Sequence, residues 1–419
     1  MTGAERNDGR GARLGRRAFL GTAAAGAAAH GAAGVAGCAD RDPGRLGPDG
    51  KLPFAGVNQA GITTPAAQFG MMAAFTVARD DRARLAGTLR ALTDEIRALM
   101  DGRLPAARDE AFPPAETGIL GAQFPPERLA VSVSVGASLF DDRFGLAGRR
   151  PRELIRMPFL ANDRLDPKIT HGDLLLTLTA ERQDVLIHAL RQLMRRTRDN
   201  LVLHWLIDGY SRPDAKPVPG RTGNRNLLGF KDGTANLDIT DEDLMRRLIW
   251  VGADDDEPDW TAGGSYQAVR IIRMLVEFWD RTPLAEQQSI IGRHKASGAP
   301  LGQGDESAEP SYAADPKGVK IPLDAHIRLA NPRTPATDDN RILRRGFNYH
   351  RGFDEGGQLD QGLAFISYQR SLEKGFLTVQ GRLKGEPLEE YILPIGGGFF
   401  FVLPGVTSDT GWLGEGMLS

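Results

Sequence analysis

Cysteine is almost absent from this chain of 419 residues: Cys38 is the only one, so no intramolecular disulfide can form. Aromatic residues make up only 7% of the sequence, and the formal net charge is −2. This near-neutral balance, with no long basic stripe, argues against nucleic acid as a partner. Long apolar runs are also missing. The Ala/Gly-rich segment 21–37 is short and only mildly hydrophobic, which argues against a permanent membrane span.

The order of the expected elements indicates an α+β fold. A chain of this length exceeds what one hydrophobic core usually supports, so two subdomains are expected. Hydrophobic periodicity predicts strands at 70–78, 130–136, 173–179, 267–278 and 362–368, helices at 80–100, 180–200 and 282–292, a helix or turn at 372–383, and a last apolar segment at 396–403. This order predicts two ferredoxin-like subdomains, 52–215 and 216–419, with antiparallel sheets and peripheral helices. The loop 213–226 joins them.

The N-terminus has the features of an export signal. Arg16-Arg17-Ala18-Phe19-Leu20 matches a twin-arginine (Tat) signal, and the Ala/Gly-rich segment follows it. We therefore expect residues 1–38 to be a signal peptide and the protein to be periplasmic or extracellular. The alternative is an alanine-rich disordered tail.

Cys38 ends the string Val35-Ala36-Gly37-Cys38, which resembles a lipoprotein cleavage box. Diacylation of Cys38 would anchor the protein at a membrane surface. Ordinary cleavage nearby would instead release it. Residues 39–51 are polar and rich in glycine and proline, and are expected to form a flexible tether.

The segment from Asp324 to Tyr349 contains one histidine followed by several arginines. A neutral imidazole such as that of His326 can be the axial ligand of a haem iron. Arginines such as Arg333 and Arg344 offer charged donors to propionates or to a developing oxyanion. Taken alone, a histidine among basic residues is more often an ordinary structural one.

A second segment, Leu227 to Asp238, contains the pattern Gly229-Phe-Lys-Asp232-Gly233. Glycine lets the backbone approach a flat ligand and adopt positive φ. An aspartate held there could accept a proton beside a metal-bound substrate. A plain Asp-Gly turn explains the same five residues equally well.

Together these segments resemble, in order and spacing, the signatures of the dye-decolourising peroxidases. The resemblance rests on Gly229 to Asn236, His326 to Arg333 and Arg344 to Tyr349, and it extends over residues 52–413. It is strongest to the Tat-exported branch associated with iron uptake, which includes deferrochelatases. It implies one haem b per chain, in the C-terminal half, and oxidation of dyes or phenolic donors by hydrogen peroxide through a ferryl intermediate.

The resemblance assigns roles by position. His326 matches the proximal haem ligand, and a carboxylate near the C-terminus, for which Asp409 is the candidate, would bond its other ring nitrogen. Asp232, Arg344 and Asn236 match the distal catalytic residues, while Arg345 would face elsewhere, toward a carboxylate or carbonyl. The remaining haem-lining positions are Gly233, Thr234, Ala235, Asn331, Pro332, Arg333, Leu363 and Phe365. Because the pKa of an ordinary aspartate is about 4, we expect the enzyme to be active at acidic pH.

Bulky donors would not reach such a pocket. Electrons would then pass through surface aromatic residues, for which Trp250, Trp260, Tyr266, Tyr349 and Tyr368 are candidates. Two other functions remain open: removal of iron from haem with the porphyrin left intact, and haem binding by a non-enzymatic lipoprotein. Besides peroxide and a reducing substrate, the expected partners are an iron-uptake system and a second copy in a homodimer.

Overall fold

The computed structural model describes residues 50–121, 125–212 and 223–419. The expected signal peptide, Cys38 and most of the expected tether lie outside this part of the chain, as do residues 213–222 of the connecting loop. No helix in the described ranges combines the length and apolar character that a membrane span requires.

The first half has the element order of a ferredoxin-like unit. Its elements are β1 (Phe69–Val77), α1 (Arg82–Met100), β2 (Ala130–Gly136), β3 (Leu174–Ala180), α2 (Gln183–Thr197) and β4 (Leu201–Tyr210). The strands pair antiparallel in the order β2-β3-β1-β4. Helix α1 begins after Asp81, whose carboxylate accepts the backbone N–H groups of Ala83 and Arg84.

The second half repeats this plan with longer connections. Its four main strands are β7 (Ser265–Met274), β9 (Phe347–Phe353), β10 (Leu359–Gln369) and β11 (Ile392–Val402). They pair antiparallel in the order β11-β7-β10-β9, which matches the order of the first half strand for strand. Its helices are α3 (Glu242–Leu248), α4 (Val276–Trp279), α5 (Leu284–Ile291), α6 (His326–Ala330), α7 (Thr378–Leu383) and α8 (Glu415–Leu418).

The two halves share one closed sheet. Strand β11 pairs with β2, β4 pairs with β9, and β7 pairs with β10, so the hydrogen-bonded ladder returns to its start. A short strand, β8 (Leu343–Arg344), adds to β10, and β5 (Asn224–Arg225) with β6 (Lys231–Asp232) forms a separate hairpin. Closure leaves few free strand edges. The expected α+β class with antiparallel strands and peripheral helices is confirmed.

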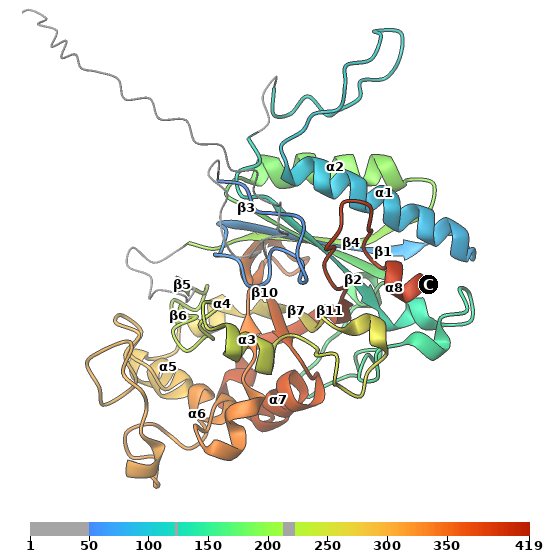
Figure 1. Ribbon diagram of the computed structural model, residues 1–419. Coiled ribbons are helices and arrows are strands. Elements are labelled where there is room, and N and C mark those ends of the chain that lie inside the picture. Colours follow the sequence, from blue (N-terminus) through green and yellow to red (C-terminus); the bar gives the residue numbers. More distant parts are fainter. Residues whose placement is uncertain (1–49, 122–124, 213–222) are drawn as a thin grey trace, which may run out of the picture. The chain divides into compact units, whose positions relative to one another are not determined.

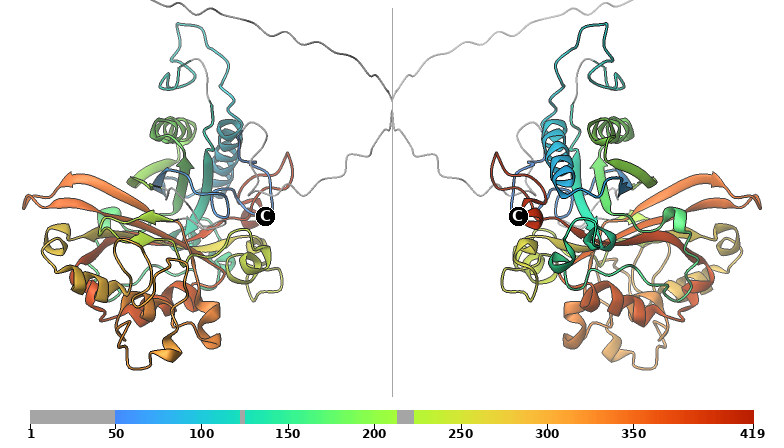
Figure 2. Two further views of the ribbon diagram at one scale, coloured as in Figure 1. Left: turned by 90° about the vertical axis from the view of Figure 1, so that its left-hand side faces the viewer. Right: turned by 90° about the vertical axis from the view of Figure 1, so that its right-hand side faces the viewer.

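Helices cover the sheet on two sides. In Figure 1, α1 and α2 lie side by side against one part of the sheet, and α5, α6 and α7 gather on the other side. The two rotated views of Figure 2 show the same separation. The helices of the C-terminal half therefore enclose the region that contains His326.

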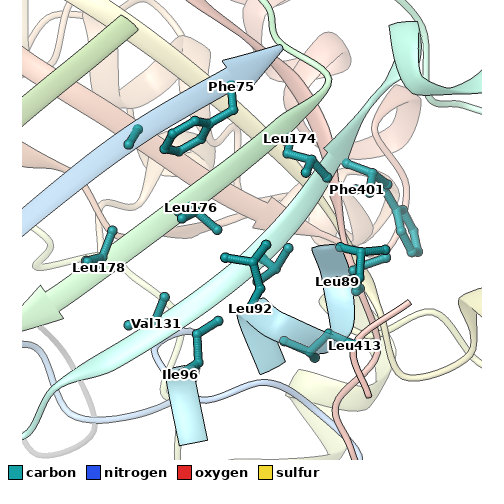
Figure 3. Close-up of a cluster of buried hydrophobic side chains, with 14 of the residues drawn as sticks. Phe75, Leu89, Leu92, Ile96, Val131, Leu174, Leu176, Leu178, Phe401 and Leu413 are labelled. Carbon is teal, nitrogen blue, oxygen red and sulfur yellow. The ribbon is translucent and has the colours of Figure 1, made fainter. Parts of the chain in front are cut away.

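The main core lies between α1, α2 and the strands of the first half. Leu89, Leu92 and Ile96 on one face of α1 point toward Val131 of β2 and neighbouring strand residues (Figure 3). Strand β1 is buried on both faces, because Met71, Ala73 and Phe75 join this core whereas Met72 and Ala74 join a second cluster. Such two-sided burial explains why these strands are apolar almost throughout.

Several local expectations need correction. The predicted strand 267–278 ends at Met274, and its last residues form α4. The segment 372–383 is helical, with a π-helical stretch, Glu373–Leu377, leading into α7. Strands β4 and β9 were not predicted, although both are needed to close the sheet. Their apolar pattern is interrupted by His204, Asp208 and the polar end of β9, which weakens the signal for a strand.

Candidate active site

His326, Asp232 and Arg344 line one pocket in the C-terminal half, with a volume of about 280 Å³. The three residues come from α6, β6 and β8, which are far apart in sequence. The pocket is also lined by most of the other residues predicted to surround the haem: Gly233, Thr234, Ala235, Asn331, Arg333, Leu363 and Phe365. Pro332 lies next to these residues in the chain but does not line the pocket.

A tight hairpin places Asp232. Strands β5 and β6 pair Asn224 with Asp232, and the carboxamide oxygen of Asn226 accepts the N–H groups of Leu228 and Phe230 in the connecting loop. Gly229 (φ +86°) and Gly233 (φ +93°) both adopt the left-handed conformation. A Cβ at Gly229 would lie 2.6 Å from Cε of Lys295. The glycines of the motif are therefore required by the turn that carries the aspartate.

Asp232 and Arg344 form an ion pair. Nη1 of Arg344 donates to Oδ1 of Asp232 at 2.5 Å, and both side chains are partly buried. Burial favours the neutral form of Asp232, but the charge and hydrogen bond of Arg344 outweigh it, so the pKa of Asp232 lies below its ordinary value. Asp232 therefore stays ionised, as a proton acceptor must, into more acidic solution than a free aspartate.

Asn236 holds Arg344 in place through its backbone. Its Nδ2 donates to the carbonyl oxygen of Arg344 at 2.7 Å, and its Oδ1 accepts the N–H of Arg344 at 3.0 Å. The side chain is buried. The sequence predicted Asn236 to be a distal catalytic residue; in the structure both ends of its carboxamide are used to position the chain at Arg344.

The carboxylate beside His326 is Glu386, and the expectation of Asp409 was wrong. Nδ1 of His326 lies 2.8 Å from Oε2 of Glu386, whose side chain is buried. Burial opposes protonation of the imidazole, but the charge and hydrogen bond of Glu386 outweigh it and raise the pKa of His326. Asp409 instead uses its backbone oxygen to accept a hydrogen bond from Arg97. The only signal for Glu386 was an acidic residue in a Gly-Glu-Pro turn.

The lining of the pocket fits an iron porphyrin. Nδ1 of His326 is occupied by Glu386, which leaves Nε2 as the nitrogen that can ligate iron. The walls are mainly apolar and include Leu363, Phe365 and Phe376, as a flat macrocycle requires. Arg333 and Arg293 also line the pocket and can pair with propionates. Leu363 and Phe365 face this side because they alternate along β10 with Ala364 and Ile366 of the core.

Four of the five aromatic residues proposed as surface relays are buried. Trp260, Tyr266, Tyr349 and Tyr368 are all buried, and Trp250 is half-buried. The hydroxyl of Tyr266 donates to Glu257 at 2.5 Å, and that of Tyr349 lies 3.3 Å from Oδ1 of Asp360. Sequence could not separate them from core residues, because aromatic side chains are common in both places.

Both halves of the chain match models of one family. Residues 59–211 match the N-terminal domain and residues 223–407 the C-terminal domain of the Dyp-type peroxidases. Together with the pocket described above, these matches show that the chain belongs to the Dyp-type (dye-decolourising) peroxidase family.

Individual relatives agree with this assignment. The chain is 50% identical over 380 residues to the deferrochelatase of Escherichia coli strain K12, with 90% of each chain covered. Two solved structures, each 34% identical with a TM-score of 0.78, are a DyP-type peroxidase from Cellulomonas bogoriensis and ferric DtpA from Streptomyces lividans. They cover 90% and 88% of this chain, and the chain covers 100% and 97% of them.

The protein is therefore a haem peroxidase. Its cofactor is haem, and its reactants are hydrogen peroxide and a reducing substrate, as the family implies. These conclusions confirm the resemblance recognised in the sequence.

Proposed function

We propose that His326, Asp232 and Arg344 carry out peroxide reduction in this protein. The observation that supports this assignment is that an imidazole backed by Glu386 and a carboxylate paired with Arg344 line the same pocket. Bound haem would supply the iron that receives peroxide and the oxidising equivalents that are passed to the donor.

Each side chain then has a distinct task. Nε2 of His326 would bind the haem iron, while Glu386 fixes the imidazole ring and strengthens its donor nitrogen. Asp232 takes a proton from one oxygen of the peroxide and delivers it to the other. Arg344 stabilises the negative charge that develops on the departing oxygen and keeps Asp232 ionised. Asn236 positions Arg344 by holding its backbone.

Absorption spectra test this assignment. The wild-type protein should bind haem and change its spectrum on addition of peroxide. His326→Ala should lose the spectrum of histidine-ligated haem, whereas Asp232→Asn should keep haem and react with peroxide much more slowly. An Asp232→Asn variant that reacts as fast as wild type would contradict the proposed role of the carboxylate.

A second function, release of iron from haem, is supported by the 50% identity to a deferrochelatase over 90% of the chain. Both functions use the same pocket, so the site geometry does not distinguish them. Incubation of the purified protein with haem, without peroxide, should then produce metal-free porphyrin with its characteristic fluorescence. If the haem stays intact during this incubation, release of iron is refuted as a function and only the peroxidase function remains. A passive haem carrier would have no need of the pair formed by Asp232 and Arg344.

For the donor, we propose dyes or phenolic compounds that exchange electrons with the protein without entering the pocket. A pocket of about 280 Å³ that also holds the cofactor leaves little room for a bulky dye. Steady-state assays with a large anthraquinone dye and a small phenol should show turnover of both. Turnover of the phenol alone would contradict oxidation at the surface.

We further propose that the chain is exported by the Tat pathway. The support is the sequence around Arg16-Arg17 and the Ala/Gly-rich segment that follows it. Replacing both arginines by lysine should retain the protein in the cytoplasm in a fractionation assay. Cys38→Ala should abolish membrane attachment if the cysteine is lipidated, and leave the location unchanged if the signal is simply cleaved. The homodimer and the iron-uptake partners stay predictions.

A further inference from the structure

A second hollow of about 40 Å³ adjoins the active pocket. It shares Asp232, Gly233, Arg344, Leu363 and Phe365 with that pocket, so the two meet at the ion pair. Its remaining lining comes from both halves of the chain: Ala66, Ala67, Ser211, Asn224, Asn236, Arg345, Gly346 and Phe347. The hollow therefore lies between the two ferredoxin-like units, beside the catalytic residues.

Arg345 is the unexplained charge in this hollow. The sequence led us to expect a carboxylate or carbonyl as its partner, and this was wrong: within the described ranges, no hydrogen bond or ion pair of its guanidinium is found. Burial lowers the pKa of Arg345 to about 10, and the nearby charge of Arg128 acts in the same direction. Arg128 itself pairs with Glu181 at 2.7 Å. The side chain of Arg345 is partly exposed and lines the hollow, so an anion that enters from solvent can pair with its guanidinium.

The charged residues that line the hollow carry one net positive charge. Asp232 and Arg344 neutralise each other through their hydrogen bond. Arg345 is then the uncompensated group among the residues that line the hollow. Asn224 donates to the hydroxyl oxygen of Ser211 at 2.9 Å, which leaves the hydroxyl hydrogen of Ser211 free to point at a ligand. A single negative charge would balance the site.

The size of the hollow limits what can bind. A water molecule needs roughly 10–15 Å³ of such volume, so 40 Å³ holds about three water-sized atoms. A halide ion fits, and so does an inorganic anion of two or three atoms. A bulky dye is too large for this hollow.

We propose that this hollow is a binding site for a small monovalent inorganic anion, held by Arg345 and flanked by Ser211 and Asn224. The proposal does not depend on the function assigned above, because none of the three residues was given a role in binding haem or reducing peroxide. Bromide is a suitable probe, since it has the required charge and size and scatters X-rays anomalously.

Diffraction provides the direct test. Crystals of the full-length protein soaked in sodium bromide should show an anomalous peak next to the guanidinium of Arg345. In Arg345→Met, which keeps an unbranched side chain and removes the charge, the peak should be absent. A wild-type crystal without bromide at this position, or an equal peak in Arg345→Met, would overturn the proposal.

Thermal unfolding provides a second test in solution. Because a ligand that binds only the folded state raises Tm, whereas the general effect of a salt acts on all variants alike, sodium bromide should raise Tm of the wild type relative to Tm of Arg345→Met in the same solution, beyond the gap that the two show without bromide. The same difference should separate the wild type from Ala66→Leu, which narrows the hollow without changing any charge. Arg79→Gln, which removes an exposed arginine, should respond to bromide as the wild type does.

The two variants also separate the site from a folding defect. If Arg345→Met does not fold, Ala66→Leu still decides the question, since it leaves Arg345 in place. A bromide effect of wild-type size in Ala66→Leu would show that bromide acts elsewhere on the protein and would refute the assignment of the hollow.

Discussion

Nδ1 of His326 and Oε2 of Glu386 lie 2.8 Å apart although 60 residues separate them in the chain. Helix α6 begins at His326, and Glu386 lies directly before the short helical turn at Pro387–Glu390 that precedes β11. The pair therefore connects the proposed iron ligand to the segment that enters the closed sheet. The negative charge of Glu386 determines how strongly the imidazole of His326 donates electrons.

Glu386→Gln should weaken the cofactor site while preserving the fold. The substitution keeps a hydrogen-bond partner for Nδ1 and removes the negative charge, so the imidazole becomes a poorer donor. A loss of about 10–100-fold in haem affinity or activity is expected for a change of this kind, and the reduction potential of bound haem should rise. Haem titration and potentiometry measure the two effects. Asp409→Asn is the matched control and should behave as wild type, because Asp409 contacts Arg97 only through its backbone.

Arg344→Gln should shift the acid limb of the pH profile for kcat/KM to higher pH. Arg344 holds the pKa of Asp232 below its ordinary value, against the effect of burial. Without that charge, the pKa of Asp232 rises and the carboxylate is protonated at a pH where the wild type is still ionised. The profile should be measured for peroxide consumption. Arg344→Lys should restore part of the shift, and an unchanged acid limb in Arg344→Gln would contradict the role of the ion pair.

Asn236→Ala should reduce the reaction with peroxide without loss of haem. The variant leaves the N–H and the carbonyl of Arg344 without their partner, at a cost of about 1 kcal/mol for each hydrogen bond. Arg344 would then be held less firmly, and kcat/KM for peroxide should fall while haem affinity stays the same. Thr240→Ala removes an exposed side-chain bond to Asp238 and serves as the control. A parallel loss of haem in Asn236→Ala would instead indicate general damage to the pocket.

Asp163→Asn should strongly destabilise the protein. Asp163 comes from the first half and Arg270 from β7 of the second, and both side chains are almost completely buried, at 1% and 2% exposure. Nη1 of Arg270 donates to Oδ2 of Asp163 at 3.2 Å. Removal of one charge of a buried pair typically costs about 3–5 kcal/mol. Urea denaturation of Asp163→Asn measures this loss, and urea denaturation of Asp163→Leu, of Arg270→Met and of the two combined completes a double-mutant cycle.

In that cycle the double variant should be more stable than either single variant, because no isolated charge is left in the core. Strictly additive losses would show that the two side chains act independently. Arg270 also lines the active pocket. The haem content of each variant should therefore be recorded beside its free energy of unfolding.

Much of the fold could be predicted from local patterns. The apolar spacing of Leu85, Leu89, Leu92 and Ile96 predicted α1 to within two residues of its start, and the valines of β2 predicted that strand with its observed bounds. Such periodicities depend on neighbours a few residues away, so they can be recognised in the sequence. Strands β4 and β9 were missed because their side chains do not alternate cleanly.

Part of the pocket was also present in the sequence. The glycines around Asp232 and the spacing from His326 to Arg344 are short-range features, and they pointed to the residues that line the pocket. Asn236 was found as well, but its contact with the backbone of Arg344 was not. That contact spans 108 residues and exists only because β6 and β8 meet.

What the sequence determined by itself is most of the main helices and strands, the α+β class and the chemical types of the side chains in its two motifs. The tertiary structure alone decided that Glu386 rather than Asp409 supports His326, that one closed sheet joins both halves, and that Arg345 lies without a counter-charge beside the active pocket. The physical reason is distance along the chain: local preferences act over a few residues, whereas the 112 residues between Asp232 and Arg344 are bridged only when the strands pair and the sheet closes.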